Sequence, residues 1–257
     1  MHILLTNDDG ISARGIRALA AAFAAAGHRV SVCAPDRERS AASHSVTLKR
    51  PLRAVPVDFL GAERAWAVDG SPADCAQLGL FLLRREDPAD LLVSGINRGM
   101  NLGGAAVYSG TVAAAMEASM CGTPAMASSL CVKSYEGEDR EDYGPSARLS
   151  VRVAEWMEAH PLPRGALYSL NVPPLPYEQI RGLRAARLSP VYLETAEYEV
   201  TADAEGLLCR YRGGEGMPMD DPAYDLSMID AGWATLTKLT WDFRLNADDG
   251  ELNEIGL

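Results

Sequence analysis

A short apolar segment at the start of the chain, residues 1–6, runs directly into Asn7-Asp8-Asp9-Gly10. A brief apolar run bounded by turn residues is typical of a buried strand in a parallel sheet. An alanine-rich helical pattern follows, in which Leu19 and Phe23 recur at helical spacing before Gly27 ends it. A strand followed at once by a helix is the start of a βα unit, so the chain is expected to belong to the α/β class.

The same alternation continues through the N-terminal two thirds of the chain. Apolar runs predict strands at 29–34, 91–93, 125–130 and 167–172. Helical patterns fall between them, at 75–83, 111–121 and 145–160, and Ser71 and Pro72 provide an N-cap and a first-turn proline for the first of these helices. Two further segments are predicted as an alternating stretch at 46–57 and a glycine-rich loop at 94–104. This order predicts a mostly parallel sheet covered by helices on both faces.

Beyond about residue 173 the composition changes. Proline, glycine and acidic residues become more frequent, and the predicted strands are isolated, at 191–193, 207–211 and 234–239. This pattern predicts β-hairpins or an extended arm and not further βαβ units. We therefore expect a single domain over 1–257, with an α/β core at about 1–173 and a C-terminal arm at about 174–257.

The net charge indicates which binding partners are unfavourable, and the cysteines indicate the cellular compartment. The formal net charge of -11 argues against a nucleic acid polymer or an anionic membrane surface as partner, because both are polyanions. The five cysteines are odd in number and form no C-x-x-C pair, which is typical of a reduced cytosolic protein. No apolar stretch approaches the roughly 20 residues of a membrane span. A cytoplasmic protein is expected.

Four loops are expected to open on one edge of the sheet, and their side chains point to metal and phosphate chemistry. The first carries Asp8 and Asp9, the second carries Ser40, and the third carries Asn97. Carboxylate, hydroxyl and amide oxygens are hard ligands that favour Mg²⁺ or Mn²⁺ over zinc. The fourth loop, Tyr108-Ser109-Gly110-Thr111, lies at a helix start, where free N–H groups suit a phosphate. The combination predicts metal-assisted phosphoester hydrolysis.

Taken singly, each of these features has a plainer structural explanation. An Asp-Asp-Gly triplet alone is more often a tight turn than a metal site. Asn97 between glycines can simply occupy a left-handed backbone position, and Ser109 can be an ordinary N-cap. Ser40 alone resembles any loop serine. The prediction therefore depends on their expected convergence at one sheet edge.

Three familiar sites are excluded by the sequence. Gly10 and Gly15 have the glycine spacing of a P-loop, but Ile16 and Arg17 stand where lysine and serine or threonine are required. No G-x-G-x-x-G motif follows the first strand, so a dinucleotide site is unsupported. No G-x-S-x-G motif of an esterase is present.

At these residues the chain strongly resembles the SurE (survival protein E) nucleotidase family, in the family's order and over nearly the whole length. The matching segments are Ile3-Leu4-Leu5-Thr6-Asn7-Asp8-Asp9-Gly10, Ala34-Pro35-Asp36-Arg37-Glu38-Arg39-Ser40-Ala41, Gly70-Ser71-Pro72-Ala73-Asp74-Cys75, Ser94-Gly95-Ile96-Asn97-Arg98-Gly99, Asn101-Leu102-Gly103, Tyr108-Ser109-Gly110-Thr111-Val112-Ala113-Ala114, Ser169-Leu170-Asn171-Val172-Pro173 and the tail from Asp225 to Leu239.

The resemblance implies a metal-dependent 5′/3′-nucleotidase with a Rossmann-like, three-layer α/β/α fold. Such enzymes hydrolyse nucleoside monophosphates, and some also act on short polyphosphate. Carried over to this chain, one divalent cation per subunit (Mg²⁺ or Mn²⁺) is bound by Asp8, Asp9, Ser40 and Asn97, of which the two aspartates are also catalytic. The residues placed near the substrate phosphate are Asn97, Ser109, Gly110 and Thr111. The family's C-terminal segment tends to be exchanged between protomers, which implies a homodimer or homotetramer.

The chain departs from the family pattern in two places. The family usually has acidic residues between Asn-Leu-Gly and Tyr-Ser-Gly-Thr, where this chain has Gly104-Ala105-Ala106-Val107. The segment from Val200 to Asp220 also matches poorly. No predicted metal position is lost.

Several alternatives stay open at the level of sequence. Asp8 or Asp9 can orient an attacking water as a base, or Asp8 can form a covalent aspartyl phosphate. A nucleotide sensor that binds without turnover is compatible with the same ligands. A sugar-nucleotide transferase shares the fold class and the metal.

Overall fold

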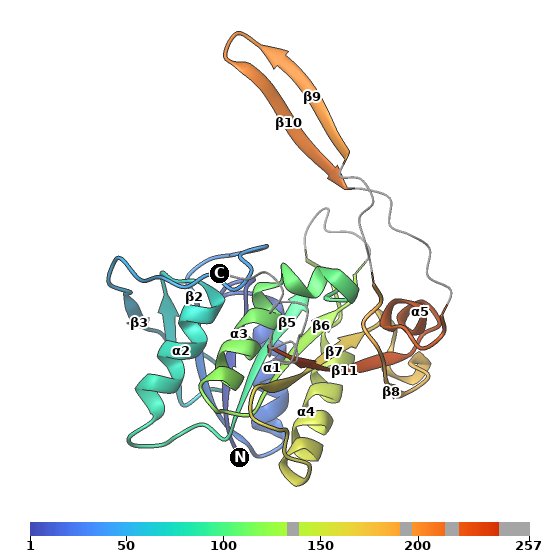
Figure 1. Cartoon of the computed structure of the whole chain (residues 1–257). Coiled ribbons are helices and arrows are strands. Elements are labelled where there is room, and N and C mark those ends of the chain that lie inside the picture. Colours follow the sequence, from blue (N-terminus) through green and yellow to red (C-terminus); the bar gives the residue numbers. More distant parts are fainter. Residues whose placement is uncertain (133–138, 191–196, 214–220, 242–257) are drawn as a thin grey trace, which may run out of the picture.

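The computed structural model describes residues 1–132, 139–190, 197–213 and 221–241. Its main sheet, in chain order, consists of β1 (His2–Thr6), β2 (Arg29–Pro35), β3 (Ala54–Pro56), β4 (Arg64–Val68), β5 (Leu91–Arg98), β6 (Ala125–Leu130), β7 (Ala166–Val172), β8 (Leu183–Ala185) and β11 (Ala234–Thr240). Across the sheet these nine strands lie in the order β3-β4-β2-β1-β5-β6-β7-β11-β8 (Figure 1).

The central part of this sheet is parallel. β4, β2, β1, β5, β6 and β7 run in one direction, each paired to its neighbour in parallel register. β3 pairs antiparallel with β4 at one end, and β11 pairs antiparallel with β7 toward the other. The predicted α/β fold with a mostly parallel sheet is therefore confirmed.

Four helices cover the two faces of the sheet. α1 (Arg14–Ala25) packs beside α4 (Gly144–Ala159) on one face, and α2 (Pro72–Leu83) packs beside α3 (Gly110–Met120) on the other (Figure 1). β1 shows why both faces are needed, because Ile3 and Leu5 are buried under α1 while Leu4 is buried in the cluster on the α2 side. Among the described residues, no helix combines the length and apolar character needed to cross a lipid bilayer.

The C-terminal region contributes both a projecting hairpin and additional strands of the main sheet. β9 (Glu197–Asp203) and β10 (Gly206–Gly213) form an antiparallel hairpin that extends away from the body of the molecule (Figure 1). α5 (Asp225–Asp230) then leads into β11, which lies between β7 and β8. The sequence predicted only hairpins or an arm here; β11 instead covers the open edge of β7, because an exposed sheet edge leaves backbone groups unpaired. The predicted strand at 191–193 lies outside the described residues.

Two N-terminal expectations also need correction. The alternating stretch at 46–57 forms a strand only at Ala54–Pro56, because the residues before it leave the sheet to contact the start of α2. The first part of the predicted loop, from Ser94 to Arg98, is strand instead, since β5 continues to Arg98. Short 3₁₀ helices lie at η1 (Gly103–Val107) and η2 (Tyr177–Gln179).

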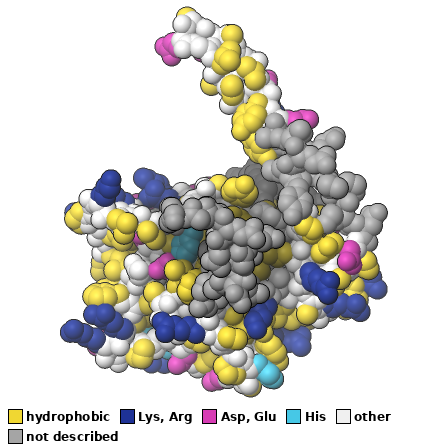
Figure 2. Space-filling model, in the orientation of Figure 1, with side chains coloured by type: hydrophobic (Ala, Val, Ile, Leu, Met, Phe, Trp, Pro, Cys, Tyr) yellow, Lys and Arg dark blue, Asp and Glu magenta, His cyan; other side chains and the backbone are white. Residues whose placement is uncertain are grey.

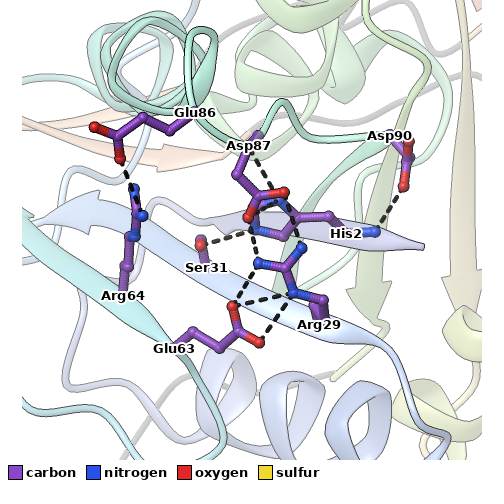
Figure 3. A network of polar contacts seen from close by, with 8 residues as sticks. All are labelled: His2, Arg29, Ser31, Glu63, Arg64, Glu86, Asp87 and Asp90. Atoms are coloured by element: carbon purple, nitrogen blue, oxygen red, sulfur yellow. Dashed lines mark hydrogen bonds and ion pairs between the residues drawn. The ribbon is translucent and has the colours of Figure 1, made fainter.

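A polar network with a buried His2 and Ser31 at its centre ties the amino ends of the strands together, opposite the loops predicted to carry the site (Figure 3). His2 Nε2 lies 2.9 Å from Ser31 Oγ, and His2 Nδ1 lies 3.3 Å from a carboxylate oxygen of Asp87. Arg29 bonds both Asp87 and Glu63, which holds the pKa of each carboxyl below its usual value. Ser31 and His2 are only 1% and 4% exposed, so this serine-histidine-aspartate set is structural and out of reach of a substrate.

The start of α2 is fixed by Asp74, whose carboxylate lies under the loop that precedes β3. Ser71 and Asp74 form a capping box, as the predicted N-cap implied. The carboxylate also accepts hydrogen bonds from the Thr47 amide at 2.8 Å and the Thr47 hydroxyl at 2.7 Å. Burial acts to raise the pKa of Asp74, but the hydrogen bonds from Thr47 and Ser71 outweigh it and the pKa is lowered.

Replacing Asp74 with alanine is expected to lower the free energy of unfolding by about 2 kcal/mol, because several donors lose a partly buried acceptor. The control is Asp58→Ala, since Asp58 is exposed, and its effect is expected to stay within about 0.5 kcal/mol. Urea unfolding measures both. The charged form of Asp74 stabilises the fold above its unfolded pKa of about 3.9, and this contribution is lost as the pH falls through the lower folded value. Equal effects of the two variants at pH 7 would contradict this assignment.

Candidate functional site

A pocket of about 640 Å³ opens at the carboxyl ends of β1 and β5, the edge where ligands bind in open α/β sheets. Five of the predicted site residues line it together: Asp8, Asp9, Ser40, Asn97 and Ser109. Gly110 and Thr111 do not line it and are buried directly behind Asp8. A larger cavity of about 1000 Å³ lies between α4 and β11, but its lining is mainly apolar and contains none of the predicted residues. Convergent polar groups identify the smaller pocket as the candidate site.

Asp8 is held by the first turn of α3. Its side chain is 5% exposed, and Oδ2 accepts a hydrogen bond from the Thr111 amide at 3.2 Å. Oδ1 accepts a short hydrogen bond from the Thr111 hydroxyl. Both oxygens of this carboxylate are therefore oriented by a single residue at a helix N-terminus, where the helix dipole favours negative charge.

Gly110 allows this close approach between α3 and β1. A Cβ atom at position 110 would lie 3.0 Å from the Asp8 Cβ and 3.0 Å from the Pro72 Cγ, tighter than side chains normally pack. Ser109 caps the helix by accepting a hydrogen bond from the Val112 amide at 3.0 Å. That bond uses the oxygen of the Ser109 hydroxyl, so its O–H remains able to donate into the pocket.

Asp9 is positioned by a bend in β5. Gly95 has a φ of 138°, and the register between β5 and β6 shifts between Ser94 and Asn97. A Cβ at Gly95 would overlap the carbonyl oxygen of Ser128, so only glycine fits this bend. The bend turns the end of β5 toward β1, where the Arg98 amide donates to Asp9 Oδ2 at 3.1 Å. Asn97 beside it uses its amide nitrogen on the Gly99 carbonyl at 3.0 Å, which leaves its oxygen for another partner.

The negative charges of Asp8 and Asp9 are disfavoured by burial and by neighbouring carboxylates. Burial raises the pKa of Asp8. Burial, and next the negative charge of Asp8, raise the pKa of Asp9 to about 7. Glu38 adds to both shifts, because it also lines the pocket. Adjacent buried carboxylates of this kind are stabilised in their charged forms by a cation.

The donor set fits a hard divalent cation. Within the described residues, no group of three or more histidine, cysteine, aspartate or glutamate side chains is placed to hold a metal. The candidate ligands are instead the carboxylates of Asp8 and Asp9 with the Ser40 hydroxyl and the Asn97 amide oxygen, all of which line one pocket. Oxygen ligands without thiolate or imidazole suit Mg²⁺ or Mn²⁺ and not zinc.

Ser40 comes from a loop fastened across the pocket mouth. The Ser40 hydroxyl donates to the Glu38 carboxylate. Ser43 has a φ of 50° and fastens the loop to η1, with its amide donating to the Tyr108 carbonyl at 3.2 Å and its hydroxyl to the Val107 carbonyl at 3.0 Å. His44 then pairs with Glu117 of α3 at 2.8 Å. The loop is thus tied to both η1 and α3, which sets the position of Ser40.

Sequence reasoning missed several residues that the structure brings into the pocket. Glu38 stands in the same loop as Ser40 but was not predicted to act. Asn101 follows β5 and donates to Ser129 Oγ at 2.8 Å. Asp139 and Tyr143 come from the segment before α4, and no motif in the sequence connects that segment with the first strand. The packing of α4 beside α1, with the contact of Arg14 to Asp139, brings this segment to the pocket.

We predict that Thr111→Val lowers the free energy of unfolding by about 1–3 kcal/mol, because it leaves one oxygen of a buried carboxylate without its hydroxyl donor. Thr235→Val is the matched control, since Thr235 is equally buried and its hydroxyl has no hydrogen-bond partner among the described residues. Chemical denaturation of both variants measures the difference. A loss no greater than that of the control would show that the Thr111 hydroxyl does not hold Asp8.

Comparison with known proteins identifies the family. The family model described as "Survival protein SurE" matches residues 3–195. The protein "5′-nucleotidase SurE" of Synechococcus sp. (strain JA-3-3Ab) is 40% identical, over 100% of this chain and 98% of the relative. The protein of the same name from Gloeobacter violaceus is 42% identical, over 94% of this chain and 90% of the relative.

The fold agrees with a solved member of that group. The crystal structure of the SurE protein from Aquifex aeolicus superposes with a TM-score of 0.84 at 30% sequence identity, and the match covers 99% of each chain. The sequence and the fold therefore give the same answer: this chain belongs to the SurE family.

Proposed function

We propose that this protein is a metal-dependent 5′/3′-nucleotidase, which hydrolyses nucleoside monophosphates to nucleoside and phosphate. The observation that carries the proposal is the pair of adjacent carboxylates, buried Asp8 and half-buried Asp9, in a pocket that also contains Ser40, Asn97 and Ser109. Family membership supports it, because the relatives from Synechococcus and Gloeobacter are named 5′-nucleotidases.

In this proposal one Mg²⁺ or Mn²⁺ per subunit is held by Asp8, Asp9, Ser40 and Asn97. When bound, the ion polarises the phosphoryl group and offsets the charge that develops on its oxygens. The fit of the donors supports this assignment: two carboxylates balance the charge of the ion, and the hydroxyl and amide oxygens complete a hard-ligand set.

The chain's own residues have separate roles around the substrate phosphate. The Ser109 hydroxyl donates to a phosphoryl oxygen, because the hydrogen bond that it accepts from the Val112 amide leaves its O–H free. Gly110 and Thr111 act through Asp8, which they orient. Asp9 uses one oxygen on the Arg98 amide, and its other oxygen has no hydrogen-bond partner among the described residues, so Asp9 can orient the attacking water.

The fixed position of Asp8 favours direct attack by water over a covalent intermediate. An aspartyl phosphate would have to form on a carboxylate oxygen of Asp8, and both of these oxygens accept hydrogen bonds from Thr111. Attack through either oxygen would turn a charged acceptor into an oxygen of an acyl phosphate and weaken the hydrogen bond that it accepts from Thr111. The geometry therefore supports a water nucleophile.

A homodimer or homotetramer is the proposed assembly, with the C-terminal region exchanged between protomers. Hydrophobic side chains gather along the projecting β9–β10 hairpin (Figure 2). Tyr198, Val200, Leu207 and Tyr211 are each more than half exposed on it, at 55%, 53%, 70% and 52%. A two-stranded arm with such a surface is marginally stable in water unless it packs against another surface.

A cytoplasmic location is proposed together with the enzyme activity. All five cysteines carry free thiols, and Cys33, Cys75 and Cys131 are buried. Burial raises the pKa of the Cys75 and Cys131 thiols, so they remain protonated and unreactive. Free thiols in this number are typical of a reducing compartment.

The activity is tested by phosphate release from AMP, GMP and tripolyphosphate with Mn²⁺ or Mg²⁺. Asp8→Asn and Asp9→Asn are each expected to lower kcat by at least about 100-fold, because each removes a charge that the metal site needs. A chelator is expected to abolish turnover and added Mn²⁺ to restore it. Asp58→Asn, an exposed carboxylate outside the pocket, is the control that keeps full activity. Tight AMP binding without release would favour a sensor, and release that requires an acceptor would favour a transferase.

The nucleophile is tested by quenching the enzyme with acid during turnover of ³²P-labelled AMP. Direct attack by water predicts no protein-bound label. A label that hydroxylamine removes would show an acyl phosphate and contradict the assignment of a water nucleophile. Asp8→Asn is the control for any label, because it lacks the carboxylate on which an aspartyl phosphate would form.

A further inference from the structure

The pocket contains one positively charged side chain within the described part of the chain, that of Arg98. Four carboxylates line the same pocket: Asp8, Asp9, Glu38 and Asp139. A phosphomonoester carries up to two negative charges, so it enters a pocket whose acidic groups outnumber its cation. A divalent ion balances only part of the combined negative charge of the carboxylates and the substrate. The position of Arg98 therefore decides whether the remaining charge on the phosphate has a cation nearby.

The backbone of Arg98 is fixed, but its side chain is weakly held. The Arg98 amide is fastened to Asp9 Oδ2 at 3.1 Å. The side chain is 17% exposed, and its Nε lies 3.8 Å from Asp139 Oδ1. That distance is an ion pair without a hydrogen bond, and the buried Nε has no hydrogen-bond partner among the described residues. A guanidinium with an unused donor beside a phosphate site is poised to bond an anion.

Asp139, in contrast, is firmly held without Arg98. Its carboxylate accepts a hydrogen bond from the Tyr143 hydroxyl at 2.9 Å and another from the Glu141 amide at 3.2 Å. Arg14 adds a second ion pair, at 3.6 Å. Asp139 therefore keeps its own partners if Arg98 moves away, which makes the Arg98–Asp139 pair easy to separate.

Resting on the proposed function, we propose that Arg98 binds the phosphoryl oxygens of the substrate, and that Asp139 holds the guanidinium at the pocket wall until the substrate arrives. Arg98 is thus a substrate-contacting residue, and Asp139 and Tyr143 are positioning residues. The guanidinium fork matches the geometry of phosphate oxygens better than a point charge does. Because Asp139 is itself negative, it opposes the phosphate while it positions Arg98.

This arrangement predicts opposite effects for the two members of the pair. Arg98→Gln removes the cation and is expected to weaken the binding of inorganic phosphate to the Mn²⁺-loaded protein by about tenfold to a hundredfold. Asp139→Asn removes a negative charge and releases the guanidinium, so it is expected to strengthen phosphate binding severalfold. Arg98→Lys is expected to fall between Arg98→Gln and the unmodified protein. Isothermal titration with inorganic phosphate measures all three.

Controls separate this role from a structural one. Arg85→Gln removes the same charge from an exposed position outside the pocket and is expected to leave phosphate binding unchanged. The Mn²⁺ affinity of Arg98→Gln is expected to stay within about twofold, and KM for AMP is expected to rise more than kcat falls. Thermal unfolding of each variant shows whether it folds, and Arg98→Lys provides the test if Arg98→Gln does not.

Two results would overturn the proposal. One is an unchanged phosphate affinity in Arg98→Gln. The other is a loss of phosphate affinity in Asp139→Asn as large as that in Arg98→Gln, because removing either partner of a merely structural ion pair has the same effect. A failure of the proposed nucleotidase function would look different: the unmodified protein would not hydrolyse AMP. Phosphate binding by the Arg98 variants would still test the role of Arg98.

Discussion

The hydrogen bonds between Asp8 and Thr111 are the interaction on which the site depends. They join the end of the first strand to the start of α3, across more than a hundred residues of sequence. A buried carboxylate is costly unless donors satisfy it, and here the amide and the hydroxyl of one residue do so at a helix N-terminus. With Asp8 fixed, the adjacent Asp9 is directed toward the end of β5, and the carboxylates are available to a cation.

Two glycines make this arrangement sterically possible, for different reasons. Gly110 lets α3 approach Asp8 so closely that a methyl group would press on the carboxylate. Gly95 bends β5 through a backbone conformation that other residues rarely adopt, and the bend brings Asn97 and Arg98 to Asp9. The positions of the charged side chains in the pocket therefore depend on two backbone features: the close packing of α3 against β1, and the bend in β5.

The sequence predicts those parts of the molecule that local patterns determine. The strand-helix alternation predicted the parallel sheet, and the loops after the strands predicted that Asp8, Asp9, Ser40, Asn97 and Ser109 line one pocket, as they do. The inward position of Thr111 and the entry of Asp139 and Tyr143 were not predictable, because they depend on packing between elements distant in sequence. The place of β11 inside the sheet was missed for the same reason: its pattern identifies a strand but not its neighbours.

The part of the pocket wall that η1 forms carries no charge. The neutral residues Gly104-Ala105-Ala106 lie in η1, and Ala105 lines the pocket. Gly103 of η1 is held from behind by buried Asp225, whose carboxylate accepts its amide hydrogen bond at 2.9 Å. The η1 side thus adds no negative charge to compete for Arg98. The acidic partner of Arg98 is instead Asp139 on the α4 side, whose carboxylate lies 3.8 Å from the guanidinium Nε.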